Sequence, residues 1–273
     1  MKIKSHKIDT DHADFDEVKK TSGTFSDGLP DTIVIHYTAG PSLSSAVNTF
    51  KDPSVEASAH VVVDLDGSIT QLIPFDRVAW HAGESSWFDR TDLNKFSIGI
   101  EIVNAGRLTK TGNVYRSWFG KKYEEDEVVQ ATHRNEQNDS WWHVFNEKQI
   151  AATQELCHEL MKSYKIKHIL GHEEISPGRK SDPGPAFPLD KLRNRLLHSN
   201  RKDQGGEEQE HRHGVVSASM LNIRSGPSAS NPTISKPLSK NTKVSILKEQ
   251  DGWYHVEVSL RGWVSKKYIH ETE

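Results

Sequence analysis

The order of apolar and polar positions predicts several strands in the first 110 residues. Thr32–Thr38 and Phe96–Val103 are nearly continuous in apolar or β-branched residues, a pattern typical of buried strands. Ser58–Val63 and Ser68–Ile73 flank Asp66-Gly67, a dipeptide that favours a tight turn between two antiparallel strands. We therefore expect a sheet built from two buried strands and a hairpin.

Helical spacing is clearest between Glu147 and Tyr164. One face of this segment presents an apolar or small residue at every third or fourth position: Ile150, Thr153, Cys157, Leu160 and Tyr164. Asn146 and Gln149 resemble a capping box at its start. Shorter helices are predicted at Ser42–Lys51 and Leu189–Leu197, and a strand at 168–170. Together these elements predict an α/β domain with a mixed central β-sheet flanked by helices.

The chain changes character near its C-terminal quarter. Residues 199–214 contain no large apolar residue, so we expect an exposed linker there. Apolar and polar residues then alternate in four short segments of residues 215–273, separated by Gly-containing turns. This pattern is typical of a small all-β barrel. The expected domains are therefore 1–198 and 215–273.

Residues 104–145 show no clean period, and we expect them to form a long insertion in the first domain. The segment contains Trp118, Trp141 and Trp142. Exposed tryptophans in such a segment would form a wall on which sugars stack, whereas buried ones would form a small core. The sequence leaves both interpretations open.

Composition excludes several classes of protein. The net charge is −3 and shows no polybasic footprint, so we expect no nucleic-acid partner. No stretch approaches the roughly 18 apolar residues of a membrane span, and the N-terminus lacks the apolar core of a signal peptide. We therefore expect a protein that is cytoplasmic as synthesised and either stays there or leaves by a route without a signal peptide. We also expect a monomer. Cys157 is the single cysteine, which excludes an intramolecular disulfide.

Three separated residues have the chemistry of a metal site. His36 ends the first buried strand, His172 follows the 168–170 strand, and Asp182 lies on a loop rich in Gly and Pro. Two histidines and a carboxylate are a ligand set that catalytic zinc uses, with a fourth position open for water. Spacing alone leaves isolated core histidines and a charged loop residue as the alternative.

Longer motifs give this set its context. The stretches IVIHYTAG, SAHVVVDLDGSITQLIPFDRVAWHAG, FSIGIEIVN and GHEEISPGRKSDPGPAF occur in this order. They resemble the zinc-dependent N-acetylmuramoyl-L-alanine amidases of the amidase-2 type, relatives of the peptidoglycan-recognition proteins. The resemblance implies that Zn²⁺ is bound by His36, His172 and Asp182. It also implies Glu101 as general base and Lys180 as the residue that stabilises the oxyanion.

The same resemblance implies a substrate. The expected reaction is hydrolysis of the amide between N-acetylmuramic acid and L-alanine in peptidoglycan or muropeptides. His60 and His81 match family positions near the site, and His60, Trp80 and His81 are expected to bind substrate. For His81 with Trp80, a pure packing role is the alternative. A non-catalytic peptidoglycan-recognition protein on the same fold is the alternative, which the full set of ligands and catalytic groups disfavours.

The C-terminal segments LNIRSGPS, DGWYHV and GWV resemble bacterial SH3-like cell-wall-binding domains. One departure concerns the stretch before Ser58. Recycling amidases of the family have an arginine there that holds substrate carboxylates, whereas this chain has SVEAS at residues 54–58. A recycling enzyme and a phage-type lysin that waits in the cytoplasm both remain possible. The wall-binding module and the missing arginine favour a wall-degrading role.

Overall fold

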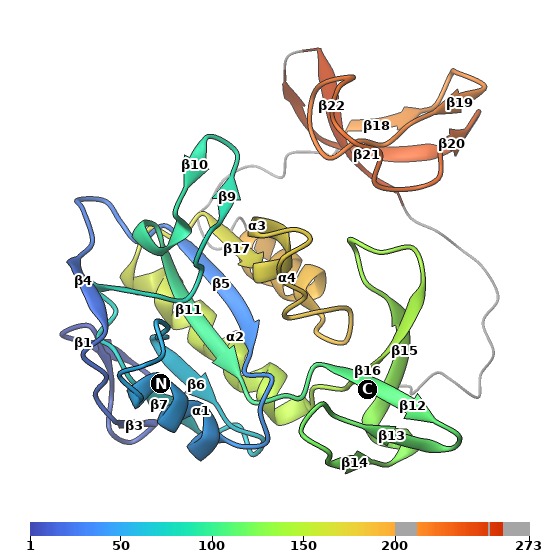
Figure 1. Ribbon diagram of the computed structural model, residues 1–273. Coiled ribbons are helices and arrows are strands. Elements are labelled where there is room, and N and C mark those ends of the chain that lie inside the picture. The colour runs from blue at the N-terminus through green and yellow to red at the C-terminus, as the bar shows by residue number, and fades with distance from the viewer. Residues whose placement is uncertain (200–211, 251, 259–273) are drawn as a thin grey trace. The chain divides into compact units, whose positions relative to one another are not determined.

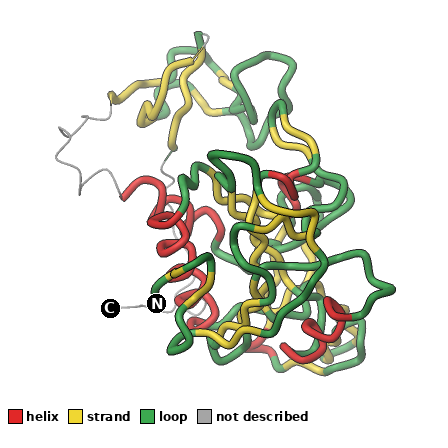
Figure 2. The backbone as a smooth tube through the Cα atoms, turned by 90° about the vertical axis from the view of Figure 1, so that its left-hand side faces the viewer, coloured by secondary structure: helices red, strands yellow, loops and turns green. Residues whose placement is uncertain are grey.

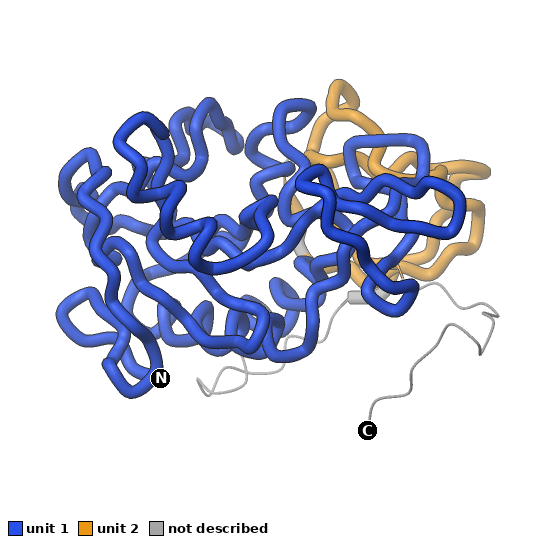
Figure 3. The backbone as a smooth tube through the Cα atoms, turned by 60° about the horizontal axis from the view of Figure 1, so that its bottom comes forward, with its two compact units in different colours: residues 1–203 blue, residues 204–273 orange. Residues whose placement is uncertain are grey.

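The computed structural model describes residues 1–199, 212–250 and 252–258. The chain divides into two compact units, Met1–Asp203 and Gln204–Glu273 (Figure 3). Within the described residues, no helix is long and apolar enough to cross a membrane.

A six-stranded sheet is the centre of the first unit (Figure 1). Its strands, in spatial order, are β17 (His168–Gly171), β5 (Thr32–Tyr37), β11 (Ser97–Ile102), β6 (Val61–Val63), β7 (Ile69–Gln71) and β3 (Ala13–Phe15). Four neighbouring pairs are parallel, and the β6–β7 hairpin is antiparallel. The predicted mixed sheet is thus confirmed, including the hairpin across Asp66-Gly67.

Helices cover both faces of this sheet (Figure 2). On one face, α2 (Glu147–Ser163) and α4 (Leu189–Ser199) pack on Ile33 and Ile35 of β5 and on Ile98 and Ile100 of β11. On the other face, α1 (Leu43–Lys51) packs near Val62 of β6. Because successive strand residues point to opposite faces, the residues between these isoleucines face away from α2 and α4.

The predicted helix caps are present. The side chain of Asn146 accepts a hydrogen bond from the Gln149 N–H, and the Gln149 side chain accepts one from the Asn146 N–H. This capping box pairs two N–H groups that have no partner within the helix. At the start of α1, the side chain of Ser42 accepts a single hydrogen bond from the N–H of Ser45. Cys157 is buried in α2, and burial raises the pKa of its thiol to about 12.

Residues 104–145 fold into a separate five-stranded antiparallel sheet, which we call the 104–145 segment. Its strands, in spatial order, are β14 (Lys122–Tyr123), β13 (Val114–Arg116), β12 (Arg107–Thr111), β16 (Asp139–His143) and β15 (Val128–Thr132). Trp142 is fully buried and Trp141 packs on the core of this sheet, whereas Trp118 is 77% exposed. The small-core interpretation is therefore right for two tryptophans, and Trp118 remains available for a ligand.

Shorter elements complete the first unit. They are β1 (Ile3–Lys4), β2 (Lys7–Ile8), β4 (Thr21–Thr24), β8 (Arg77–Ala79), β9 (Ser86–Trp87), β10 (Arg90–Thr91), α3 (His172–Ile175) and the 3₁₀ turns Leu93–Lys95 and Glu125–Glu127.

The described part of the second unit consists of strands and loops. Strands β18 (Arg212–Val215), β21 (Lys243–Gln250) and β22 (Trp253–Glu257) form one antiparallel sheet, and β19 (Met220–Leu221) pairs with β20 (Leu238–Ser239). These strands agree with the expected all-β unit. Its last predicted segment, around residues 261–269, and most of the predicted linker lie outside the described residues.

Candidate metal centre

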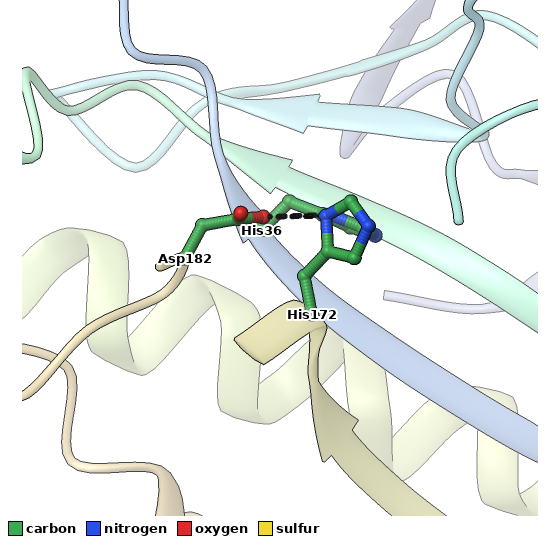
Figure 4. A group of neighbouring side chains, drawn as sticks. All are labelled: His36, His172 and Asp182. Carbon is green, nitrogen blue, oxygen red and sulfur yellow. Dashed lines mark hydrogen bonds and ion pairs between the residues drawn. The ribbon is translucent and has the colours of Figure 1, made fainter. Parts of the chain in front are cut away.

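Two neighbouring parallel strands deliver the histidines of the site. Strand β17 pairs with β5 in a register that places Gly171 beside Ile35. The next residue of each chain segment is a histidine, so His172 and His36 lie together at the carboxyl ends of their strands. Asp182 comes from the loop between α3 and α4 and completes the group (Figure 4). The structure thus brings together all three predicted ligands.

Three potential ligand atoms converge. The Nδ1 atoms of His36 and His172 are 2.9 Å apart, and Oδ2 of Asp182 lies 2.9 Å and 3.0 Å from them. All three residues are buried. Zinc–ligand bonds of 2.0–2.1 Å at tetrahedral angles place neighbouring ligand atoms about 3.3 Å apart. The observed separations are close to that value.

The proton positions on His36 follow from its neighbours. His81 Nε2 lies 3.1 Å from the carbonyl oxygen of Ser97, so it donates its proton there. His81 Nδ1 is then an acceptor, and it lies 3.0 Å from His36 Nε2. His36 Nε2 must therefore donate to His81, which leaves a lone pair on His36 Nδ1. Burial, followed by the neighbouring His172, lowers the pKa of His36 to about 4, which agrees with a neutral ring.

His172 has the same arrangement. Its Nε2 lies 3.0 Å from the carbonyl oxygen of Ala82 and donates to it, so Nδ1 again has a lone pair. Two imidazole lone pairs and a carboxylate oxygen consequently face one another in a buried space. Such groups are stable together when a cation lies among them. The donor chemistry of the site therefore fits a bound metal ion.

Glu101 lies directly beside this group. It is the neighbour of His36 in the β5–β11 register, and its Oε2 is buried without a hydrogen-bond partner among the described residues. Burial, and then the negative charge of Asp182, raise the pKa of Glu101 to about 8. The result is a carboxyl group that binds and releases a proton near neutral pH.

Lys180 is half-buried on the loop that contains Asp182. Burial has the largest effect on both neighbouring groups, raising the pKa of Glu101 and lowering the pKa of His36. The positive charge of Lys180 has a smaller effect and lowers both pKa values. Of the predicted catalytic pair, Glu101 thus lies beside His36, and Lys180 lies two residues before Asp182 in the sequence.

The three predicted substrate-binding residues have different surroundings. His60 is fully buried; its Nε2 bonds to the Arg77 carbonyl at 2.8 Å and its Nδ1 accepts from the Gly99 N–H at 3.0 Å. This burial argues against the predicted contact with substrate. His81 is also buried and instead orients His36. Trp80 is half-buried and donates its indole N–H to Ser22, so its contact with substrate stays a prediction.

Sequence reasoning missed several residues around Asp182. The hydroxyl of Tyr37 lies 2.9 Å from the hydroxyl of Ser181, the residue before Asp182, and the two form a hydrogen bond. Glu173, next to His172, bonds to His133 of the 104–145 segment. Glu173 stands next to the predicted ligand His172 in the motif and could be read there as an acidic neighbour. Its bond to His133 could not be predicted, because His133 lies 40 residues away in a segment without a clear pattern.

One exposed aromatic residue lies against the loop that follows His36. The indole N–H of Trp118 donates to the carbonyl oxygen of Ala39 over 2.6 Å. Its ring also contacts Phe119 edge to face, at a centroid distance of 5.6 Å. A side chain with most of its surface in solvent is thus held in a fixed orientation.

Comparison with known proteins identifies two families in this chain. Residues 26–185 match the family described as N-acetylmuramoyl-L-alanine amidase, and residues 219–270 match the bacterial SH3 domain. The first match covers more than half of the 273-residue chain. The chain belongs to the N-acetylmuramoyl-L-alanine amidase family.

Two curated relatives illustrate the similarity. The chain is 34% identical over 169 residues to N-acetylmuramoyl-L-alanine amidase AmiD of Escherichia coli K12, covering 59% of this chain and 51% of AmiD. It is 32% identical over 151 residues to 1,6-anhydro-N-acetylmuramyl-L-alanine amidase AmpD of Salmonella typhimurium LT2, covering 55% and 62%. The chain thus spans between half and two thirds of the length of these relatives.

A structural comparison gives a related result. The crystal structure of a Se-Met AmpD derivative superposes with a TM-score of 0.49 and 23% sequence identity. The superposition covers 71% of this chain and 98% of the AmpD chain.

Proposed function

We propose that the protein hydrolyses the amide bond between N-acetylmuramic acid and L-alanine in peptidoglycan, with zinc held by His36, His172 and Asp182. The observation that supports this most strongly is the buried carboxyl of Glu101 beside His36, whose Oε2 has no hydrogen-bond partner within the part of the chain that the structure describes. A receptor that only binds peptidoglycan has no use for such a group. Family membership and the names of the relatives agree with the proposal.

The ligand set suits zinc because it combines two imidazole nitrogens with one carboxylate oxygen. When bound, zinc supplies Lewis-acid polarisation of the amide carbonyl and lowers the pKa of water from 15.7 to about 7. His81 and the Ala82 carbonyl fix the two rings so that their Nδ1 atoms face the ion. Groups that orient metal ligands in this way raise ligand basicity and metal affinity.

Glu101 performs the proton transfers in this proposal. Its Oε2 takes the proton of the attacking water and then gives it to the leaving amino group of L-alanine. A carboxyl group can act as the base in the first step and as the acid in the second, and such transfer contributes roughly 10²–10⁴-fold to the rate. Strand β11 is buried throughout, so the carboxyl is held at a fixed distance from His36.

Lys180 stabilises charge on the substrate. Attack on the amide carbon places negative charge on the carbonyl oxygen, and an ammonium group nearby lowers the energy of that state. The half-buried position of Lys180 on the Asp182 loop keeps its charge less screened than on an open surface.

One feature supports polymeric peptidoglycan as the preferred substrate, and a second supports contact with its sugars. The bacterial SH3 domain raises the local concentration of the enzyme on an insoluble polymer if it binds the wall. Trp118 offers a sugar ring an exposed, oriented aromatic face beside the loop after His36. We therefore infer that a sugar of the glycan strand contacts Trp118.

Product analysis tests the proposed reaction. The purified protein is incubated with intact sacculi and with soluble anhydro-muropeptides, and new amino termini of L-alanine are quantified. The proposal expects their release from sacculi, loss of release after chelation, and recovery with zinc. Cleavage at another bond, or activity that chelation leaves intact, would exclude this function.

A further inference from the structure

The buried carboxylate of Glu173 joins the 104–145 segment to the metal centre. His133 Nε2 lies 2.5 Å from its Oε2, and Arg134 Nε lies 2.9 Å from its Oε1. The Gly184 N–H donates to the same Oε2 over 3.1 Å. Both Glu173 and His133 are only 2% exposed. The carboxylate of Glu173 therefore bonds both to the 104–145 segment and to the loop that contains Asp182.

Glu173 also contacts this loop through its main chain. Its N–H donates to the carbonyl oxygen of Asp182 over 2.8 Å. The loop is thus held at residue 182 by the backbone of Glu173 and at residue 184 by its side chain. These two bonds bracket the third metal ligand, so a shift of Glu173 shifts the position of Asp182.

His133 is oriented for its bond to Glu173. Its Nδ1 accepts from the Asn135 N–H at 3.2 Å, so the proton is on Nε2 and points to the carboxylate. Its ring stacks on Trp142, with centroids 5.7 Å apart and an interplanar angle of 22°.

Trp142 makes a second connection to the same loop. Its indole packs against Gly184, where a Cβ atom would lie 2.9 Å from the ring and where φ is +72°. Glycine at this position permits both the backbone conformation and the close approach. The 104–145 segment therefore contacts the Asp182 loop twice, by hydrogen bonding through Glu173 and by packing on Gly184.

We propose that His133 is a positioning residue for the metal ligand Asp182, acting through Glu173, and that the 104–145 segment thereby sets the metal affinity of the site. This inference depends on one part of the proposed function, namely that the site binds zinc. Removing His133 leaves a buried carboxylate without one of its partners, which disturbs the bonds that this carboxylate makes elsewhere. Loss of groups that orient metal ligands lowers metal affinity by about 10- to 100-fold.

The test compares His133→Ala with a matched variant of the same segment, His143→Ala. His143 is also buried, but its ring contacts Ala105 and Tyr123 within the segment itself. Zinc affinity is measured by competition with a chromophoric chelator, and ligand geometry by the visible absorption of the Co²⁺-substituted protein. We expect His133→Ala to bind zinc about 10- to 100-fold more weakly with an altered Co²⁺ spectrum. His143→Ala should match the wild type in both, and His133→Gln, which retains an N–H donor, should recover part of the loss.

Wild-type zinc affinity and an unchanged Co²⁺ spectrum in folded His133→Ala would overturn the proposal. Circular dichroism gives the folded fraction, and Glu173→Gln, which keeps side-chain volume, is a second variant with the same expected losses. Both readouts need no substrate. If the wild type binds zinc but leaves the amide uncut, the proposed function fails and the positioning role stands. If the wild type cuts the amide and His133→Ala binds zinc normally, only the positioning role fails.

Discussion

His36 and Glu101 occupy paired positions on the neighbouring parallel strands β5 and β11, so their side chains leave the sheet on the same face. Ile35, next to His36, and Ile100 and Ile102, on either side of Glu101, belong to the core that packs against α2 and α4. A slip of one residue between the strands would turn Glu101 toward these helices. The register of two buried strands therefore fixes the acid–base group beside the first metal ligand.

The raised pKa of Glu101 predicts an unusual pH dependence of stability in metal-free protein. Its pKa is about 8 in the folded chain, against 4.5 ordinarily, so between these values the folded state retains a proton that the unfolded state has lost. Stability due to this group therefore falls as pH rises from about 4.5 to 8. Glu101→Gln removes this dependence, so metal-free Glu101→Gln should gain stability over wild type as pH rises. Urea unfolding at pH 5 and pH 8 measures the difference, and an equal difference at both pH values would refute the assignment.

Replacing His81 should weaken zinc binding although it contacts no substrate in this account. His81→Phe leaves the Nε2–H of His36 without its acceptor and frees the ring to turn. We expect about a 10- to 100-fold loss of zinc affinity, measured by chelator competition. His60→Phe is the control, because His60 is also buried and its ring lies beside that of His81, but its own ring nitrogens bond to main-chain groups of Arg77 and Gly99. Equal zinc affinities in the two variants would show that His81 does not orient His36.

Trp118 is predicted to act on substrate binding and not on chemistry. Trp118→Ala should raise KM for glycan-containing substrates about five-fold with little change in kcat, which corresponds to about 1 kcal/mol of stacking energy. Phe88→Ala is the control, since Phe88 is 80% exposed on the turn between β9 and β10. Steady-state kinetics on a muropeptide that includes the sugar measures both constants. A fall in kcat alone, or the same rise in KM for Phe88→Ala, would contradict a sugar contact at Trp118.

Removal of the second unit should affect polymer and fragment differently. A chain ending at Asp203 retains the first compact unit and its hydrophobic core. If the SH3 domain tethers the enzyme to the wall, digestion of sacculi should fall much more than cleavage of a soluble muropeptide. Rates on the two substrates, compared with those of the full chain, provide the measurement. An equal fall on both would indicate that the second unit stabilises the first unit instead.

Much of the central sheet could be predicted because its signals are local. Strands β5 and β11 are buried on both faces, so their apolar runs are continuous, and the capping box of α2 involves residues three positions apart. The three potential ligands could be proposed because each follows a strand end or lies in a dense motif. Prediction succeeded where neighbouring residues alone determine the structure.

The 104–145 segment could not be predicted for the opposite reason. Its strands are two to five residues long, too short to show a period, and β12 pairs with β16 across some 30 residues of chain. The bond between His133 and Glu173 joins two such distant segments. His60 and His81 likewise could not be told apart, because their roles depend on main-chain groups brought near by folding.

The measurement that tests the central claim most directly compares zinc content with turnover in Glu101→Gln. In this account Glu101 transfers protons and is not a metal ligand, so the variant should bind one zinc with near wild-type affinity. Its release of L-alanine amino termini from sacculi should fall about 10²–10⁴-fold. Normal turnover by the zinc-loaded variant would contradict the assignment of Glu101 as the group that transfers the proton.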